Sequence, residues 1–313
     1  MRTGPAVLAS VLVFCSLPAH AETDVFGRIN REMRWTLDGS PYRLVGDVNI
    51  GPNGLVLVDA GVEVVAIPEE APGEGEDPTR VELVIEGRLV ARGTVDAPVV
   101  FRPHAPDAEG GWRGLRLEGD GTVRLEHAQL LGTVRAIDGR STFPPEALST
   151  ATFRRCQTGL YWASAADLDL RATAIHGDCA RAIDVVPLEG VRRALVRVRD
   201  SVLSGGVLIA GTQTVVVSGS EVHGGTDGVS ISGADDVRVE GTYVELNEGI
   251  LIRSDGPAVV ARGEPLRQPA VRGRPRSRLR DPGRGRGARR GSGGVPARVG
   301  RGGRLPRAVR SRR

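Results

Sequence analysis

Hydrophobic and polar residues alternate in short runs along much of the chain, and the runs recur at a regular spacing. Between Val123 and Val239 an apolar–x–apolar pair returns about every 23 residues, and a small residue follows it three positions later. Alternation with a period of two predicts short β-strands with one buried face and one solvated face. The segments, each with its small residue, are Val123–Leu125 (Ala128), Ala151–Phe153 (Cys156), Leu168–Leu170 (Thr173), Val196–Val198 (Ser201), Val215–Val217 (Ser220) and Val237–Val239 (Thr242).

A second strand follows in every repeat. It opens with a small residue and then an aliphatic one, and its fourth position is large and apolar except at Gly139. When residues of the same type recur at the same position of every repeat, the repeats typically stack directly on one another, about 4.8 Å apart, around a shared aliphatic core. The sequence therefore predicts an all-β parallel solenoid. The opening pairs are Ala136-Ile137, Gly159-Leu160, Ala182-Ile183, Gly206-Val207, Gly228-Val229 and Gly249-Ile250.

The earlier part of the chain contains a more specific pattern. Gly87–Thr94 follows G-x-L-x-A-x-G-T, Pro98–Phe101 follows P-V-x-F, and Trp112–Leu115 follows W-x-G-L. This series of motifs resembles the coils of bacterial secreted right-handed parallel β-helix proteins in the pectate-lyase-like (pectin lyase-like) superfamily. The resemblance spans residues 36–255 and implies a right-handed parallel β-helix.

We expect this β-helix to occupy residues 36–261 with roughly eight or nine coils, after an N-terminal cap or lead-in at 22–35. The superfamily includes pectate lyases, polygalacturonases, uronan epimerases and adhesins, so the resemblance is specific to fold. The polygalacturonase series N-T-D, D-D, G-H-G, R-I-K is reduced here to Asp235-Asp236 and His223-Gly224-Gly225. The chain has no lysine, and no acidic calcium-binding cluster aligns. The resemblance therefore transfers no catalytic residue, and we expect no cofactor and no metal.

The first residues have the pattern of a secretory leader. Arg2 is followed by the apolar stretch Ala6–Leu17 and by an A-x-A motif that ends at Ala21. This stretch is shorter than the roughly 20 residues of a membrane span, and no later segment is apolar enough to be one. We expect residues 1–21 to be a signal peptide cleaved after Ala21, and the mature chain to be secreted to the periplasm, the cell surface or beyond.

Charge divides the chain into two unlike parts. Residues 262–313 hold 18 of the 42 basic residues but only two of the 38 acidic ones, so residues 1–261 carry a net charge of about −12. An acidic body excludes a basic nucleic-acid-binding domain, and no nucleic-acid partner is expected. The tail is rich in Arg, Gly and Pro and too poor in apolar residues to fold, which predicts disorder. Either it is a genuine basic extension, or it is the product of a frameshift in a GC-rich gene, which we favour.

In a solenoid, residues far apart in sequence meet in columns along the stack. The outward position of the second strand places Asp138, Tyr161 and Asp184 in one column, with the two aspartates about 9–10 Å apart. That separation suits two carboxyl groups that flank a water in inverting glycoside hydrolysis. Arg135 and Arg181 precede the aspartates by three residues and could bind a carboxylate. The candidate site is thus catalytic Asp138 and Asp184 with binding residues Arg135, Tyr161 and Arg181; the alternative is a solvated strand face with incidental ion pairs.

A second candidate column follows the next corner and contains His176, Ser204, His223 and Glu245. Imidazole, hydroxyl and carboxylate groups could perform acid–base chemistry, whereas metal coordination would need closer convergence than two coils allow. Ordinary corner residues are the alternative interpretation.

After cleavage of the leader, two cysteines remain, Cys156 and Cys179, one coil apart. In an oxidising compartment they would either pair as a disulfide or stay as two buried thiols.

Two functions fit these observations. The first is a secreted, non-catalytic β-helix that presents its long face to glycans or other cell-surface polymers. The alternative is a carbohydrate-active enzyme, a hydrolase, lyase or epimerase, that acts on an acidic polysaccharide through Asp138 and Asp184.

Overall fold

The computed structural model describes residues 22–68, 75–224, 229–246, 250–254 and 258–261. The predicted signal peptide (1–21), the predicted tail (262–313) and Gly228 and Gly249 lie outside these residues. Within the described part of the chain, no helix is long and apolar enough to cross a membrane.

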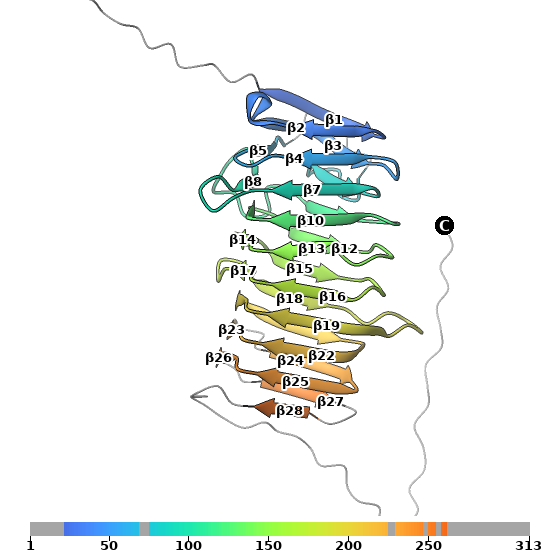
Figure 1. Cartoon of the computed structure of the whole chain (residues 1–313), viewed down its shortest axis with the longest axis vertical. Coiled ribbons are helices and arrows are strands. Elements are labelled where there is room, and N and C mark those ends of the chain that lie inside the picture. The colour runs from blue at the N-terminus through green and yellow to red at the C-terminus, as the bar shows by residue number, and fades with distance from the viewer. Residues whose placement is uncertain (1–21, 69–74, 225–228, 247–249, 255–257, 262–313) are drawn as a thin grey trace, which may run out of the picture. The chain divides into compact units, whose positions relative to one another are not determined.

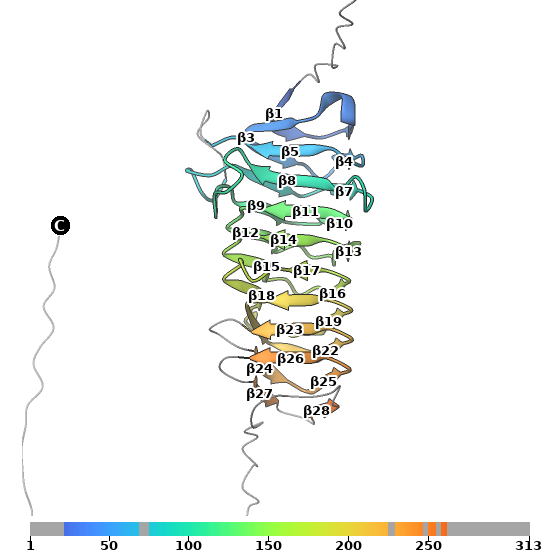
Figure 2. The same ribbon diagram turned by 90° about the vertical axis from the view of Figure 1, so that its left-hand side faces the viewer.

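The described residues form a parallel β-helix, as the repeat pattern predicts. Its strands lie on three faces, A, B and C, and the chain visits them in the order B, C, A in each coil. Figure 1 looks onto face B and shows the coils stacked along the long axis, and Figure 2 looks onto face C. Each paired strand in the described chain runs parallel to its neighbours, which is possible because a complete coil separates them.

The strand bounds follow the three faces. Face A contains β1 (Thr23–Ile29), β3 (Tyr42–Ile50), β6 (Glu82–Ile85), β9 (Gly114–Leu117), β12 (Arg135–Gly139), β15 (Thr158–Trp162), β18 (Arg181–Val185), β21 (Gly206–Ala210), β24 (Val229–Ala234) and β27 (Ile250–Ser254). Face B contains β2 (Glu32–Trp35), β4 (Leu55–Val58), β7 (Arg88–Arg92), β10 (Thr122–Glu126), β13 (Ala147–Ser149), β16 (Leu168–Arg171), β19 (Arg193–Arg199), β22 (Thr212–Ser218), β25 (Asp236–Glu240) and β28 (Ala258–Ala261). Face C contains β5 (Glu63–Ala66), β8 (Val99–Pro103), β11 (Ala128–Leu131), β14 (Thr152–Arg154), β17 (Ala174–Ile175), β20 (Val202–Ser204), β23 (Glu221–Gly224) and β26 (Tyr243–Leu246).

Residues 22–35 belong to the stack rather than leading into it. Strand β1 pairs with β3 and β2 pairs with β4, so this segment adds a coil at the N-terminal end. Both β1 and β3 bend from face C to face A, which joins these faces into one sheet of 18 strands beside the 10-stranded sheet of face B. A one-turn 3-10 helix, η1 (Leu37–Gly39), lies between β2 and β3.

The corner between faces B and C is built in the same way in successive coils. One residue takes the left-handed backbone conformation, with φ between 47° and 56°, and the residue after it is buried. In three of these coils the buried residue carries a hydroxyl whose oxygen accepts a hydrogen bond from the backbone of the preceding coil, as Ser201 Oγ does from Thr173 N at 3.2 Å. The small residues at regular spacing are therefore a buried corner column. The corner pairs are His127-Ala128, Thr150-Ala151, Ala172-Thr173, Asp200-Ser201, Gly219-Ser220 and Gly241-Thr242.

One of the six predicted alignments is wrong. Ala151–Phe153 lies on the B–C corner and in β14 of face C, and the face B strand of that coil is β13, where Leu148 points inward. The small residue of this coil is consequently Ala151, and Cys156 lies at the corner between faces C and A. The misalignment arose because strands of faces B and C show the same alternation, and β13 offers a single buried leucine where its neighbours offer two aliphatic residues.

Gly139, the exception in the second-strand series, has a packing explanation. A Cβ at this position would lie 1.9 Å from Cε3 of Trp162, which pairs with Gly139 from the next coil. Trp162 is fully buried, and its indole N–H donates to the carbonyl of Ala166 at 3.0 Å. The indole ring thus fills the volume that an aliphatic residue occupies in the other coils.

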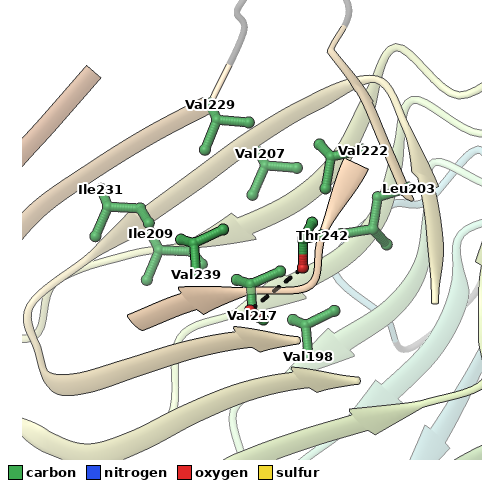
Figure 3. A pocket seen from close by; sticks show the side chains of 10 residues that line it. All are labelled: Val198, Leu203, Val207, Ile209, Val217, Val222, Val229, Ile231, Val239 and Thr242. Carbon is green, nitrogen blue, oxygen red and sulfur yellow. Dashed lines mark hydrogen bonds between the residues drawn. The ribbon is translucent and has the colours of Figure 1, made fainter. Parts of the chain in front are cut away.

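The core contains a small cavity near its C-terminal coils. Figure 3 shows a cavity of about 20 Å³ lined by aliphatic side chains of the described residues and by Thr242, whose hydroxyl is directed to the Val217 carbonyl at 3.4 Å. A cavity of this size costs about 0.5 kcal/mol in lost packing. Because it is apolar and barely larger than a water molecule, we interpret it as imperfect packing rather than a ligand site.

Candidate functional site

The strand register aligns the predicted face A column. Asp138 in β12 pairs with Tyr161 in β15, and Tyr161 pairs with Asp184 in β18. Arg135 and Arg181 both pair with Thr158, from opposite sides. The five predicted residues therefore lie together on the outside of three successive coils.

Asp138 is buried despite its outward position, with 2% of its surface exposed. Its Oδ2 accepts hydrogen bonds from Arg135 Nη1 at 2.8 Å and Arg140 Nη2 at 2.9 Å, and its Oδ1 accepts one from Arg140 Nε at 3.0 Å. These three charge-assisted hydrogen bonds hold the carboxylate between the two guanidinium groups. The geometry makes Asp138 the centre of an ion-pair network.

Asp184 and Tyr161 are more accessible, but both contact an arginine. Asp184 accepts a hydrogen bond from Arg181 Nη1 at 2.6 Å, and its side chain is 16% exposed. The guanidinium of Arg135 lies over the Tyr161 ring, with Cζ 3.7 Å from the ring centroid. Arg135 thereby covers the ring face on which a sugar could otherwise stack.

Further charged residues, which sequence reasoning missed, extend the site. Arg116 in β9 pairs with Asp138 in the same column, one coil earlier, and Arg113 lies just before β9. The segment between β5 and β6 brings Glu76 to these arginines, with Glu76 Oε2 3.1 Å from Arg113 Nη2 and Oε1 3.4 Å from Arg116 Nη1. Glu76 also accepts hydrogen bonds from Nη1 and Nη2 of Arg140. Column alignment could have found Arg116, whereas the course of a long connection follows no repeat.

We name this group the arginine cluster: Arg113, Arg116, Arg135, Arg140 and Arg181, with the carboxylates Glu76, Glu82, Asp138 and Asp184. Glu82, the first residue of β6, is the most enclosed member, with no exposed surface, and its Oε2 lies 3.3 Å from Arg116 Nη2.

The carboxylates of the cluster differ in their electrostatics. Burial raises the pKa of Glu82 and outweighs the opposing effect of Arg116. The hydrogen bond from Arg140 lowers the pKa of Glu76. The Nε atoms of Arg113 and Arg116 are buried without a hydrogen-bond partner in the described structure, although Arg116 Nε lies 3.3 Å from Glu118 Oε1.

The second predicted column also lies in register, on face C. Ser204 pairs with His223, and His223 pairs with Glu245. His176 follows Ile175, which pairs with Leu203, so it aligns with Ser204. The described side chains do not converge on one point: His176 is exposed, and His223 Nε2 lies 3.5 Å from Glu221 Oε2 on its own strand. The side chain of Glu245 lies outside the described residues.

Cys156 and Cys179 are joined by a disulfide, with Cα atoms 4.3 Å apart. Both are buried at the corner between faces C and A, so the bond links two neighbouring coils. Within the described residues, no group of three or more His, Cys, Asp or Glu side chains could hold a metal ion.

Comparison with known proteins adds no assignment: no family model, no curated protein and no solved structure matches this chain. The functional argument therefore depends on the geometry of the arginine cluster.

Proposed function

We propose that the protein is a secreted, non-catalytic β-helix that binds acidic glycans or other acidic cell-surface polymers through face A. The observation that carries the proposal is the arginine cluster itself: five guanidinium groups gather on one rigid face of a chain whose first 261 residues are acidic overall. Guanidinium groups bind carboxylates through paired hydrogen bonds. Strands stacked about 4.8 Å apart hold these groups at the short, regular spacing that a polymer with repeated charges needs.

The state of the carboxylates favours binding over catalysis. A general acid or base must reach the substrate and exchange a proton with it. Asp138 is buried and accepts hydrogen bonds from Arg135 and Arg140, and Asp184 accepts a hydrogen bond from Arg181. In this arrangement the aspartates orient Arg135, Arg140 and Arg181, whose side chains are more exposed than the aspartates that they contact.

Binding is tested with polygalacturonate and alginate, with dextran as an uncharged control polymer, by isothermal titration calorimetry. We expect the double variant Arg135→Gln/Arg181→Gln to weaken binding about tenfold or more, because two charge-assisted contacts are lost. The control variant Arg154→Gln/Arg197→Gln removes the same charge from faces C and B and should bind as the unchanged protein does. Added salt should weaken binding, because exposed charges are screened.

Two results would contradict the proposal. Equal loss of affinity in both double variants would mean that only net charge matters, and absence of binding to either acidic polymer would remove its basis. The same incubations are assayed for new reducing ends and for unsaturated uronates. Turnover that Asp184→Asn abolishes would establish the carbohydrate-active enzyme instead.

A further inference from the structure

Glu76 occupies a position that a carboxylate ligand could take. Its two oxygens face three guanidinium groups: Arg140 donates through Nη1 and Nη2, Arg113 Nη2 lies 3.1 Å away, and Arg116 Nη1 lies 3.4 Å away. This is the two-pronged geometry with which arginine recognises carboxylates. The surrounding arginines therefore make a site whose shape and charge suit one carboxylate group.

Among the carboxylates that contact these three arginines in the described structure, Glu76 has the most exposed side chain. It also lies outside the β-strands. Its side chain is 39% exposed, whereas Glu82 and Asp138 are 0% and 2% exposed. Glu118 is 36% exposed, but its printed contact is with Arg116, whereas Glu76 contacts Arg113, Arg116 and Arg140. Glu82 and Asp138 belong to β6 and β12, and Glu76 reaches the cluster from the connection between β5 and β6. An exposed side chain on a connection can be displaced at a lower cost than a buried one in a sheet.

The charge balance would favour a replacement anion. Without Glu76, the four guanidinium groups of Arg113, Arg116, Arg135 and Arg140 face the three carboxylates Glu82, Glu118 and Asp138, a surplus of one positive charge among these residues. A partly buried positive site left empty would be unfavourable, so the arginines need a carboxylate from some source.

We propose that Arg113, Arg116 and Arg140 form a carboxylate-binding site that Glu76 fills in the free protein and that a uronate carboxylate of an acidic polymer fills in the complex. The inference deepens the proposed function and rests on it, because it identifies the ligand group and the residues that receive it. Glu76 acts as a built-in competitor: the polymer binds only the molecules in which Glu76 has left the arginines.

The competition predicts a gain of affinity when Glu76 is removed. If Glu76 fills the site in about nine molecules out of ten, the apparent affinity is about tenfold below the intrinsic one. The experiment measures the Kd of digalacturonate for the unchanged protein, Glu76→Ala and Glu76→Gln. We expect Kd to fall about tenfold in Glu76→Ala, and to fall in Glu76→Gln as well, because the neutral amide preserves the size of the side chain but not its charge.

Two controls separate the site from general charge effects. Glu126→Gln removes a carboxylate that contacts Arg92 and Arg124 on face B, so it makes the same change in net charge, and its Kd should equal that of the unchanged protein. Adding Arg140→Ala to Glu76→Ala should abolish the gain. A crystal of Glu76→Ala grown with digalacturonate should place a sugar carboxylate against the three arginines.

The failures of this inference and of the proposed function are distinguishable. If all three proteins bind digalacturonate equally, and Arg135→Gln/Arg181→Gln still loses polymer binding, the inference is wrong and the proposed function stands. An increase in Kd in both Glu76 variants would also overturn the inference, because Glu76 would then be a ligand-binding group itself. If no variant binds any uronate, both proposals fail.

Discussion

Replacement of Asp138 by asparagine distinguishes a structural carboxylate from a catalytic one. The substitution keeps the shape of the side chain but converts one acceptor oxygen into an NH₂ donor. That donor would face the guanidinium groups of Arg135 and Arg140, which are donors only. With 2% of its surface exposed, residue 138 cannot turn to water for compensation.

The size of the effect follows from the contacts. Asp138 accepts three hydrogen bonds from charged groups, at 2.8, 2.9 and 3.0 Å. Such bonds contribute about 1.5–3 kcal/mol each, but Arg135 and Arg140 are partly exposed and can recover water when the carboxylate is lost. Breaking a buried ion pair by removing one partner generally costs about 3–5 kcal/mol. We therefore expect Asp138→Asn to lower the free energy of unfolding by about 3 kcal/mol.

Asp184→Asn is the matched control. Asp184 occupies the same column two coils later, is 16% exposed, and accepts a hydrogen bond from Arg181, whose side chain is 35% exposed. Its replacement should cost less than about 1 kcal/mol, as for partly exposed ion pairs. Both variants are measured by urea unfolding followed by far-UV circular dichroism, and the slope of the transition checks that unfolding stays comparable.

The reasoning would be refuted if Asp138→Asn were as stable as Asp184→Asn. An Asp138→Asn protein of unchanged stability that lost turnover on an acidic polysaccharide would support the catalytic role instead.

Two further predictions concern packing and cross-linking. Gly139→Ala should lower the free energy of unfolding by about 3 kcal/mol, because its Cβ would overlap the Trp162 ring in the core. Thermal unfolding measures this loss of stability, and an unchanged unfolding temperature would mean that the ring can move aside. Reduction, or Cys156→Ala/Cys179→Ala, should cost about 3 kcal/mol, as expected for a cross-link between cysteines 23 residues apart; a urea midpoint unchanged by reductant would contradict this.

The alignment of columns was predictable because two simple periods determine it. Side chains alternate with a period of two within a strand, and the coil length is nearly constant, so Asp138, Tyr161 and Asp184 had to share a column once the stack was recognised. The alignment failed at Ala151, where a three-residue face B strand left too short a pattern to distinguish it from the face C strand that follows.

The surroundings of the site were not predictable in the same way. Glu76 reaches Arg140 across 64 residues of sequence, from the connection between β5 and β6, whose course the repeat does not specify. The burial of Asp138 depends on Arg135 and Arg140, whose side-chain directions no repeat specifies. Columns predict which residues are neighbours, but hydrogen bonds and connections decide which of them remain accessible.

The ion pairs between Glu76 and Arg140 also bear on how the molecule unfolds. In a stack, each coil contacts the coil above and the coil below, so cooperativity is transmitted between nearest neighbours. Glu76 precedes β6 and Arg140 follows β12, so their contact spans the coil of β9 and joins second neighbours. Amide hydrogens in β6, β9 and β12 should therefore exchange as one unit. A polymer that displaces Glu76 would break the contact that couples these coils. Ligand binding would then lower the local stability of this part of the stack while the bound polymer stabilises the surface that it covers.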